Sequence, residues 1–155
     1  MFEHGTLIAG TTNQYILYFS DKNGSTIRRV IDLANRSSEP ELRQYVMHSL
    51  DQPAYMEFTK AGTKKSEIWY NAGRLHRAGA AAWISYYGNQ VIHERWYTNG
   101  VLHRTDGPAI ASYSRAGKLK DTEWIVDGNT VGVNLYSNNP LTLAEQIEFK
   151  LKYMS

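Results

Sequence analysis

The sequence predicts an α+β fold in which an antiparallel β-meander, built from hairpin repeats, is extended by an N-terminal hairpin and capped by two helices. Three observations predict it. They are an internal period of about 27 residues, two-residue turn signals inside each period, and two helix-start signals outside the repeats. The chain of 155 residues fits one domain, so we treat residues 1–155 as a single unit.

The repeats occupy residues 53–132 and form three units. Residues 67–77 recur at 94–104, and an eroded third copy spans 123–131. A second block recurs beside the first, at 53–58, 81–86 and 108–113. All four tryptophans lie within these units, so tryptophan belongs to the repeat.

The turns indicate what each unit is. Asn99-Gly100 and Asp127-Gly128 are signals for type I′ turns, because those turns need positive φ at both central residues. Ala72-Gly73 is a weaker version of the same signal, and Gly88-Asn89 and Ala116-Gly117 close the alternate hairpins. Each unit is therefore predicted to be two short strands, and successive units extend one meander.

The turn positions also predict which residues face one another. Tyr97 should oppose Leu102 and Trp96 should oppose His103, with the same pairing for Tyr70 and Leu75 and for Trp69 and His76. Alternation along a strand then places Trp and His on one face and Tyr with Leu on the other. The predicted columns across the sheet are Trp69, Trp96 and Trp124, and Tyr70, Tyr97 and Ile125.

The flanks carry different signals. In the N-terminal region, residues 1–38, a hairpin is predicted over 14–33 around Asn23-Gly24. Capping-box patterns beginning at Ser38 and Thr142 predict helices over 39–50 and 142–153. The second helix would present Leu143, Ile147, Leu151 and Met154 as one apolar stripe. We expect both helices to cap the sheet, at its ends or on one face, as repeat arrays generally require.

Composition excludes several classes of function. Seventeen basic against fifteen acidic residues provide no strongly basic groove, so we expect no nucleic-acid partner. The absence of cysteine excludes disulfides and Cys-based metal sites and agrees with a reducing compartment. Without a long apolar run or a signal sequence, we expect no membrane association and a cytoplasmic location.

The second unit, Trp96-Tyr97-Thr98-Asn99-Gly100-Val101-Leu102-His103-Arg104-Thr105-Asp106-Gly107-Pro108-Ala109, resembles a MORN-like repeat. It is similar to the form W-Y-x-N-G-x-L-H-R-x-D-G-P-A found in proteins of bacteriophages and large DNA viruses. The first unit departs from that form at residues 78–81, and the third has lost the L-H-R element. The resemblance implies stacked hairpins that serve as interaction or spacing surfaces, and a viral or phage accessory protein.

Two sets of side chains are candidate site residues. Partner-binding anchors are the aromatic and arginine residues typical of binding hot spots, namely Trp69, Arg77, Trp83, Trp96, Tyr97 and Arg104. A ligand phosphate could instead be held by His76, Arg77, His103 and Arg104. Their recurrence at matched positions favours a structural role, in which His stacks on Trp and Arg binds Asp106. We predict no catalytic residues, no metal site and no cofactor.

The sequence therefore predicts a non-enzymatic accessory protein that binds and inhibits or sequesters a host protein, for instance in anti-defence, through its aromatic repeat sheet. Two alternatives stay open. One is a sponge for a nucleotide or another small molecule, and the other is a structural or assembly protein of a virion or oligomeric array. The partner, the face that binds it, the oligomeric state and the role of the N-terminal 50 residues are left open at this stage.

Overall fold

The computed structural model describes residues 2–7, 14–36, 45–47, 49, 51–134 and 142–153. Its strands are β1 (Phe2–Leu7), β2 (Gln14–Ser20), β3 (Thr26–Arg36), β4 (Tyr45–Met47), β5 (Tyr55–Phe58), β6 (Lys64–Ile68), β7 (Tyr70–Asn71), β8 (Arg74–Leu75), β9 (Trp83–Tyr87), β10 (Gln90–Arg95), β11 (Tyr97–Thr98), β12 (Val101–Leu102), β13 (Ile110–Tyr113), β14 (Leu119–Val126) and β15 (Asn129–Asn134). One helix, α1 (Leu143–Tyr153), follows them.

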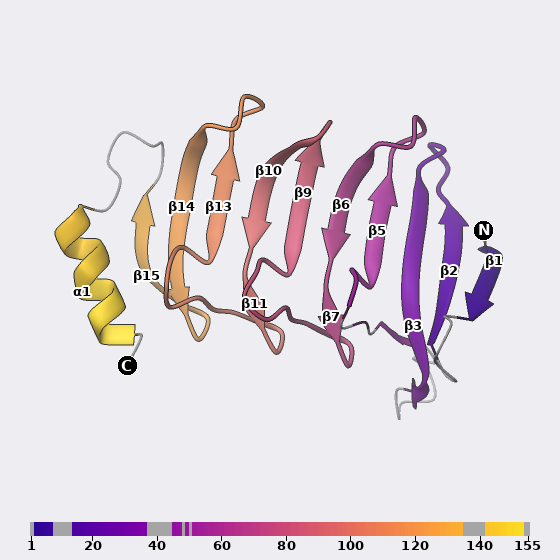
Figure 1. Ribbon diagram of the computed structural model, residues 1–155, viewed down its shortest axis with the longest axis horizontal. Helices are drawn as coiled ribbons and strands as arrows, with labels where there is room; N and C mark the ends of the chain where they lie inside the picture. Colours follow the sequence, from indigo (N-terminus) through magenta and orange to yellow (C-terminus); the bar gives the residue numbers. More distant parts are fainter. Residues whose placement is uncertain are drawn as a thin grey trace.

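The strands form one long antiparallel sheet, which confirms the predicted meander. Eleven strands belong to it, in the order β1-β2-β3-β5-β6-β9-β10-β13-β14-β15, with β4 paired to β3. The short pairs β7-β8 and β11-β12 form two small hairpins of their own. Figure 1 shows the strands in a single row, with the small hairpins at the lower edge and α1 beyond β15.

The three predicted two-residue turns have the backbone of type I′ turns. Their central φ values are 46° and 76° at Ala72-Gly73, 50° and 87° at Asn99-Gly100, and 50° and 77° at Asp127-Gly128. Asparagine and aspartate tolerate this left-handed region better than alanine does, so the first turn is the most strained of the three. Gly88-Asn89 closes the β9-β10 hairpin and Ala116-Gly117 the β13-β14 hairpin, as predicted.

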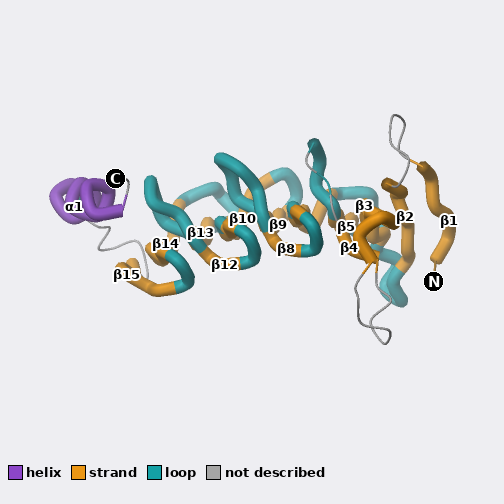
Figure 2. The backbone as a smooth tube through the Cα atoms, turned by 90° about the horizontal axis from the view of Figure 1, so that it is seen from below, coloured by secondary structure: helices purple, strands orange, loops and turns teal. Residues whose placement is uncertain are grey.

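The predicted register of the hairpins is also confirmed. Tyr70 pairs with Leu75 and Tyr97 with Leu102, and the N–H of His103 donates to the carbonyl of Trp96 at 3.1 Å. Successive units are joined through the same positions, because each turn glycine donates to a carbonyl of the preceding unit. Gly100 donates to Leu75 at 2.8 Å and Gly128 donates to Leu102 at 2.9 Å. Figure 2, seen from below, shows the segments around β8 and β12 curving in a similar way, one after the other along the row.

Tryptophan and alanine alternate across the sheet where the units meet. The N–H of Trp69 donates to Ala82 and that of Trp96 to Ala109, both at 2.7 Å. These two alanines are fully buried. A large ring beside a methyl group fills the space between strands without overlap, so the predicted tryptophan column exists but is interleaved with alanine.

The predicted helix over 39–50 is wrong where the structure describes it, because Tyr45–Met47 form strand β4 against β3. The carbonyl of Met47 accepts the N–H of Gly73 at 3.0 Å, as Leu75 does from the next turn. The sequence from Met47 to Ala54, M-H-S-L-D-Q-P-A, also matches the L-H-R-T-D-G-P-A that begins at Leu102. Part of an earlier unit therefore precedes the three predicted ones, and pairing with β3 outweighs the local helix signal.

The C-terminal helix begins as predicted. The N–H of Glu145 donates to Oγ1 of Thr142 at 3.3 Å, and the N–H of Thr142 donates to Oε2 of Glu145 at 2.7 Å, which is a complete capping box. No helix among the described residues has the length and apolar character needed to cross a membrane.

The helix lies at the end of the sheet and contacts it, as predicted, but its predicted apolar stripe does not make the contact. Leu143, Ile147 and Leu151 are exposed, and Met154 lies outside the described residues. The contact is made instead by Phe149, whose ring meets that of Trp124 edge-on with centroids 4.3 Å apart. In the first two units an arginine covers the tryptophan ring. The third unit has Gly132 at that position, so its ring is left for Phe149 to cover.

Candidate partner-binding surface

The strand register divides the side chains of the sheet between two faces. We call open face the two rows that run through Tyr55, Ile68, Trp83, Arg95, Ile110 and Glu123, and through Glu57, Ser66, Ser85, His93, Ser112 and Asp121. None of these side chains is buried. The opposite face, which we call the covered face, carries Glu67, Ile84, Ala111 and Thr122, and all four are buried. The two faces therefore differ in what they can offer a partner.

Trp69 and Trp96 belong to the covered face, and each is stacked under an arginine of its own unit. Cζ of Arg77 lies 3.9 Å from the ring centroid of Trp69, and Cζ of Arg104 lies 3.7 Å from that of Trp96. Such cation–π contacts stabilise the arrangement further when the groups are partly desolvated. These two rings are therefore engaged within the fold.

Each of these arginines is held by further contacts. Arg104 donates through Nη1 to the carbonyl of Pro108 at 3.2 Å and pairs through Nε with Asp106 at 2.7 Å. Arg77 makes the matching bond to the carbonyl of Ala81 at 3.3 Å. In the R-x-D-G-P-A pattern of the second unit, R is Arg104, D is the aspartate that pairs with it, and P is the proline whose carbonyl accepts its other hydrogen bond. The predicted contact between Arg104 and Asp106 is present.

The two repeat histidines link each unit to the next. Nδ1 of His76 accepts the N–H of Asn99 at 3.2 Å, and Nδ1 of His103 accepts the N–H of Asp127 at 3.1 Å. Oδ1 of Asp127 also lies 2.9 Å from Nδ1 of His103, but a neutral ring nitrogen that accepts the amide proton cannot also donate to the carboxylate. That second contact becomes an ion pair only in the protonated imidazole.

The structure brings most of the predicted site residues together. His76, Arg77, Trp96, Tyr97, His103 and Arg104 line one shallow hollow between the first and second units. Asp106 lines it too, and the carboxylate opposes the binding of a phosphate there. The histidines, the arginines, Trp96 and Asp106 in this hollow thus already have partners within the repeat. Trp69 and Trp83 lie outside the hollow.

Trp83 stands apart from the other predicted anchors because it lies on the open face. It pairs directly with Arg95, whose Cζ is 4.2 Å from the Trp83 ring centroid. Together with Ser85 and His93, the two residues line a small pocket. The sequence alone does not indicate that Arg95, Ser85 and His93 are neighbours of Trp83, because only the strand register places them beside it.

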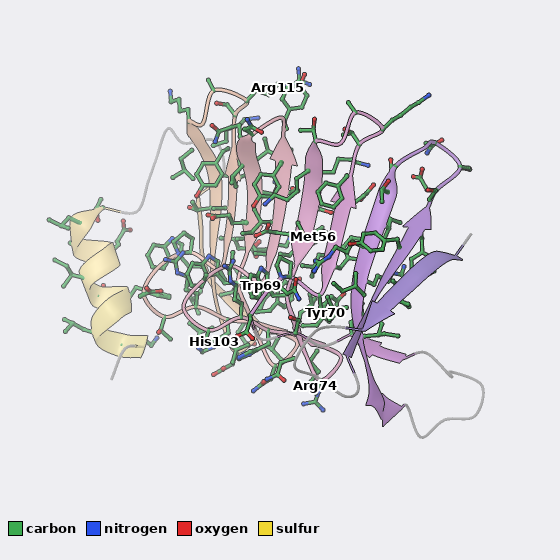
Figure 3. The ribbon with its side chains drawn as sticks, turned by 45° about the vertical axis from the view of Figure 1, so that its right-hand side comes forward. Met56, Trp69, Tyr70, Arg74, His103 and Arg115 are labelled. Atoms are coloured by element: carbon green, nitrogen blue, oxygen red, sulfur yellow. The ribbon has the colours of Figure 1, made fainter. Side chains whose placement is uncertain are left out.

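A larger groove continues from this pocket toward the turns at the upper end of the sheet. Its lining includes His93, Ser112, Tyr87 and Arg115. Cζ of Arg115 is 4.1 Å from the ring centroid of Tyr87, which is 53% exposed. Figure 3 shows Arg115 at the upper turns, far along the strands from His103 at the lower hairpins. The open face thus combines aromatic, hydroxyl, imidazole and guanidinium groups.

The carboxylates of the covered face are paired. Oε2 of Glu94 accepts the hydroxyl proton of Tyr113 at 2.8 Å, and burial together with this carboxylate raises the pKa of Tyr113 to about 12. Glu67 pairs with Nζ of Lys64 at 2.6 Å. The contact of Glu94 with Tyr113 joins β10 to β13 by their side chains, whereas Lys64 and Glu67 belong to the same strand, β6.

Within the described parts of the chain, no three histidine, aspartate or glutamate side chains gather as metal ligands would. Comparison with models of known protein families, with curated proteins and with solved structures finds no match. The fold and the surface by themselves define the class of protein: a repeat protein made of one extended sheet, with one face that is open and chemically mixed.

Proposed function

We propose that this protein is a non-enzymatic module that binds a partner protein through the open face of its sheet. The observation that carries the proposal is the position of Trp83, which pairs with Arg95 within the two rows of the open face, and none of the side chains in these rows is buried. Tryptophan, tyrosine and arginine are the residues most often found at the centres of protein interfaces. Trp69 and Trp96 are likewise stacked against arginines, but they belong to the covered face.

The mechanism that fits such a surface is occlusion of the partner. A long sheet presents its side chains in regular rows, so it can cover a broad surface without moving its own backbone. The resemblance to repeats of phage and large-virus proteins supports a host protein as the partner, and inhibition or sequestration as the outcome of binding. This part of the proposal rests on the resemblance and on no contact described above.

The test is a capture experiment from bacterial lysate followed by affinity measurement with the captured protein. Trp83→Ala and Arg95→Glu should each weaken binding by at least about tenfold, as loss of a central anchor does. Lys60→Glu is the matched control, since Lys60 is exposed in the turn after β5, away from Trp83. A captured protein that binds both open-face variants as tightly as the control would contradict the proposal.

The nucleotide sponge is tested in parallel by thermal shift with a panel of nucleotides. A nucleotide present at about 100 times its dissociation constant adds roughly 2.7 kcal/mol to the free energy of unfolding. The hollow between the units would be its site, and the shift should then grow in Asp106→Asn, which removes the opposing charge. No shift with any nucleotide, in either protein, counts against the sponge.

A further inference from the structure

The arginines stacked on aromatic rings in the repeats differ in what their N–H groups meet. Arg77 and Arg104, on the covered face, also donate to backbone carbonyls of their own units. Arg95 and Arg115, on the open face, are stacked in the same way, but their guanidinium groups donate to no oxygen among the residues that the structure describes. A guanidinium has five N–H donors in a planar fork, so these two can bind an acceptor from outside the chain.

The surroundings of Arg95 favour a charged acceptor. The strand register places Arg95 between Trp83 and Ile110, and the residue is half-buried. Apolar neighbours reduce the screening of charge by water. Because the Trp83 ring lies against the flat side of the guanidinium, the edge that carries the N–H groups stays free. A carboxylate matches such an edge with two parallel hydrogen bonds.

Cations predominate in the larger groove of the open face. Arg115 and Lys120 line it, and Asp121 is the acidic residue that its described lining contributes. Arg95 lies in the small pocket that the groove continues. Positive charge is therefore present toward both ends of this part of the open face, in β10 and in the turn between β13 and β14.

The carboxylates of the open face already have partners. Asp121 accepts the hydroxyl proton of Ser112 at 3.0 Å, and Glu123 accepts that of Thr130 at 2.7 Å. Glu57 forms an ion pair with a lysine of β6. These groups are thus engaged within the chain, and they do not supply the acceptor that the open-face arginines lack.

We infer that the open face recognises an extended acidic segment of its partner, whose carboxylates pair with Arg95 and Arg115. This inference rests on the proposed function and adds the chemistry of the partner to it. Ile110 lies opposite Arg95, and Arg115 follows Ile110 in the chain at a distance of about 16 Å for the usual rise of a strand. An extended peptide of about five residues covers that distance. Figure 1 shows β9, β10 and β13 side by side, so such a segment can lie along them.

The stacked arginines favour a carboxylate over a nucleobase. A base needs a free ring face on which to stack. Cζ of Arg95 lies 4.2 Å from the ring centroid of Trp83, and Ile68 pairs with Trp83 from the neighbouring strand. Cζ of Arg115 lies 4.1 Å from the ring centroid of Tyr87. The rings thus hold the arginines in place, and single-stranded nucleic acid is the competing outcome of the test.

The first test measures peptide binding to the full chain by fluorescence anisotropy at about 50 mM salt. The probe is a labelled peptide of about 12 residues in which glutamate alternates with serine, so that an extended chain presents every glutamate on one side. Its control has glutamine in place of glutamate. The glutamate peptide should bind at least about tenfold more tightly, and about 500 mM salt should remove most of this difference.

The second test uses variants of the open face. Arg95→Gln and Arg115→Gln should each weaken binding of the glutamate peptide by at least about threefold. Arg74→Gln is the matched control, because Arg74 is exposed in a lower hairpin, far from Arg115 in Figure 3, and its affinity should not change. Arg95→Lys should recover part of the affinity, since lysine keeps the charge but not the planar fork. Arg115→Gln decides the test if Arg95→Gln disturbs the circular dichroism spectrum.

The inference is overturned by a glutamine peptide that binds as tightly as the glutamate peptide, or by no binding up to about 1 mM. Arginine variants that bind like Arg74→Gln overturn it too. Tighter binding of an oligothymidylate of the same length, weakened by the same variants, would assign the face to single-stranded nucleic acid.

The captured partner separates this inference from the proposed function. A partner whose binding is weakened by Trp83→Ala, but is insensitive to salt and to Arg115→Gln, would overturn the acidic segment and leave the proposed function intact. Failure of the proposed function has a different result, in which the partner binds Trp83→Ala and Arg95→Glu as tightly as the unchanged chain.

Discussion

The imidazole of His103 extends from its own hairpin to the next one, where Nδ1 accepts the backbone N–H of Asp127 at 3.1 Å. His76 makes the same bond to Asn99 one unit earlier. The amide at the first central residue of a type I′ turn has no hydrogen-bond partner within its own hairpin, and each of these bonds supplies one. The histidines that suggested chemistry are thus the links between consecutive units.

Replacing His103 should therefore loosen the contact between the second and third units. His103→Ala should lower the free energy of unfolding by about 1 kcal/mol, the usual net contribution of one such hydrogen bond. His103→Asn should recover part of the loss, because its side-chain oxygen can take the position of Nδ1. Urea unfolding followed by tryptophan fluorescence measures both.

Val101→Ala is the control for His103, since Val101 is exposed in the same small hairpin. Its effect should stay within about 0.5 kcal/mol, as for most surface substitutions. Equal losses in His103→Ala and Val101→Ala would show that the imidazole does not link the units.

Because Gly107 has no side chain, the guanidinium of Arg104 can pack directly against its backbone. A Cβ at this position would lie 2.8 Å from Cζ of Arg104, so Gly107→Ala should displace the guanidinium from the Trp96 ring. We expect a loss of about 1–3 kcal/mol in the free energy of unfolding, which is typical of overpacking. Chemical denaturation measures the loss, and a shift in tryptophan fluorescence should accompany it.

Gly132→Ala is the matched control, because a Cβ there meets Trp124 at 3.7 Å, an ordinary contact, and the backbone is not left-handed. This variant should be neutral or slightly stabilising, since alanine restricts the unfolded chain. If both glycine variants lose the same stability, the close approach of Arg104 is not the reason that glycine occupies position 107.

Turn chemistry makes the hairpin register the part of the fold that the sequence predicts best. A type I′ turn determines which residues pair on either side of it, and Asn99-Gly100 and Asp127-Gly128 are strong signals for that turn. Repetition then extends the same pairing to Tyr70 and Leu75. The face on which each tryptophan lies is less predictable than the register. Trp83 lies outside these turns, so its neighbours are determined by the pairing of β9 with β10.

Of the two predicted helices, the one over 39–50 is wrong where the structure describes it, and the one over 142–153 is present but meets the sheet with a different side. Around residues 39–50 the capping box and apolar spacing were local signals, and backbone pairing of Tyr45–Met47 with β3 outweighed them. The M-H-S-L-D-Q-P-A string was the signal that could have revealed the strand. At α1 the helix is present, but Trp124 offers contact to a single ring, which Phe149 supplies, so the longer apolar stripe faces outward. The amphipathic spacing of a helix does not by itself show which side of the helix will pack against a sheet.

Ala72 adopts φ 46°, a left-handed conformation that alanine rarely takes. The equivalent residues are Asn99 and Asp127, both at φ 50°. Ala72→Asn should therefore stabilise the protein by about 0.5–1 kcal/mol. The reciprocal change, Asn99→Ala, should destabilise it by a similar amount, and thermal unfolding compares the two. Stabilisation by neither Ala72→Asn nor Ala72→Gly would show that the first turn carries no strain.

Tyr113 provides a test of the covered face at high pH. Its pKa is raised to about 12 by burial and by the neighbouring Glu94, whereas a tyrosine in the unfolded chain ionises near pH 10. Between about pH 10 and pH 12 the folded protein keeps a proton that the unfolded chain loses, so stability is complete below pH 10 and falls as the pH rises. After allowance for partial exposure, the loss should be about 1 kcal/mol.

Urea unfolding at about pH 9 and about pH 11 measures this loss, and Tyr113→Phe should remove its share of the pH dependence. Burial also raises the pKa of Tyr55, Tyr70 and Tyr86. The free energy of unfolding of the variant should therefore still depend on pH, but less steeply. Absorbance at about 295 nm should show that a tyrosine that ionises near pH 12 is missing from Tyr113→Phe. An identical titration and an identical pH dependence in the two proteins would show that Glu94 and Tyr113 are not in contact in the folded state.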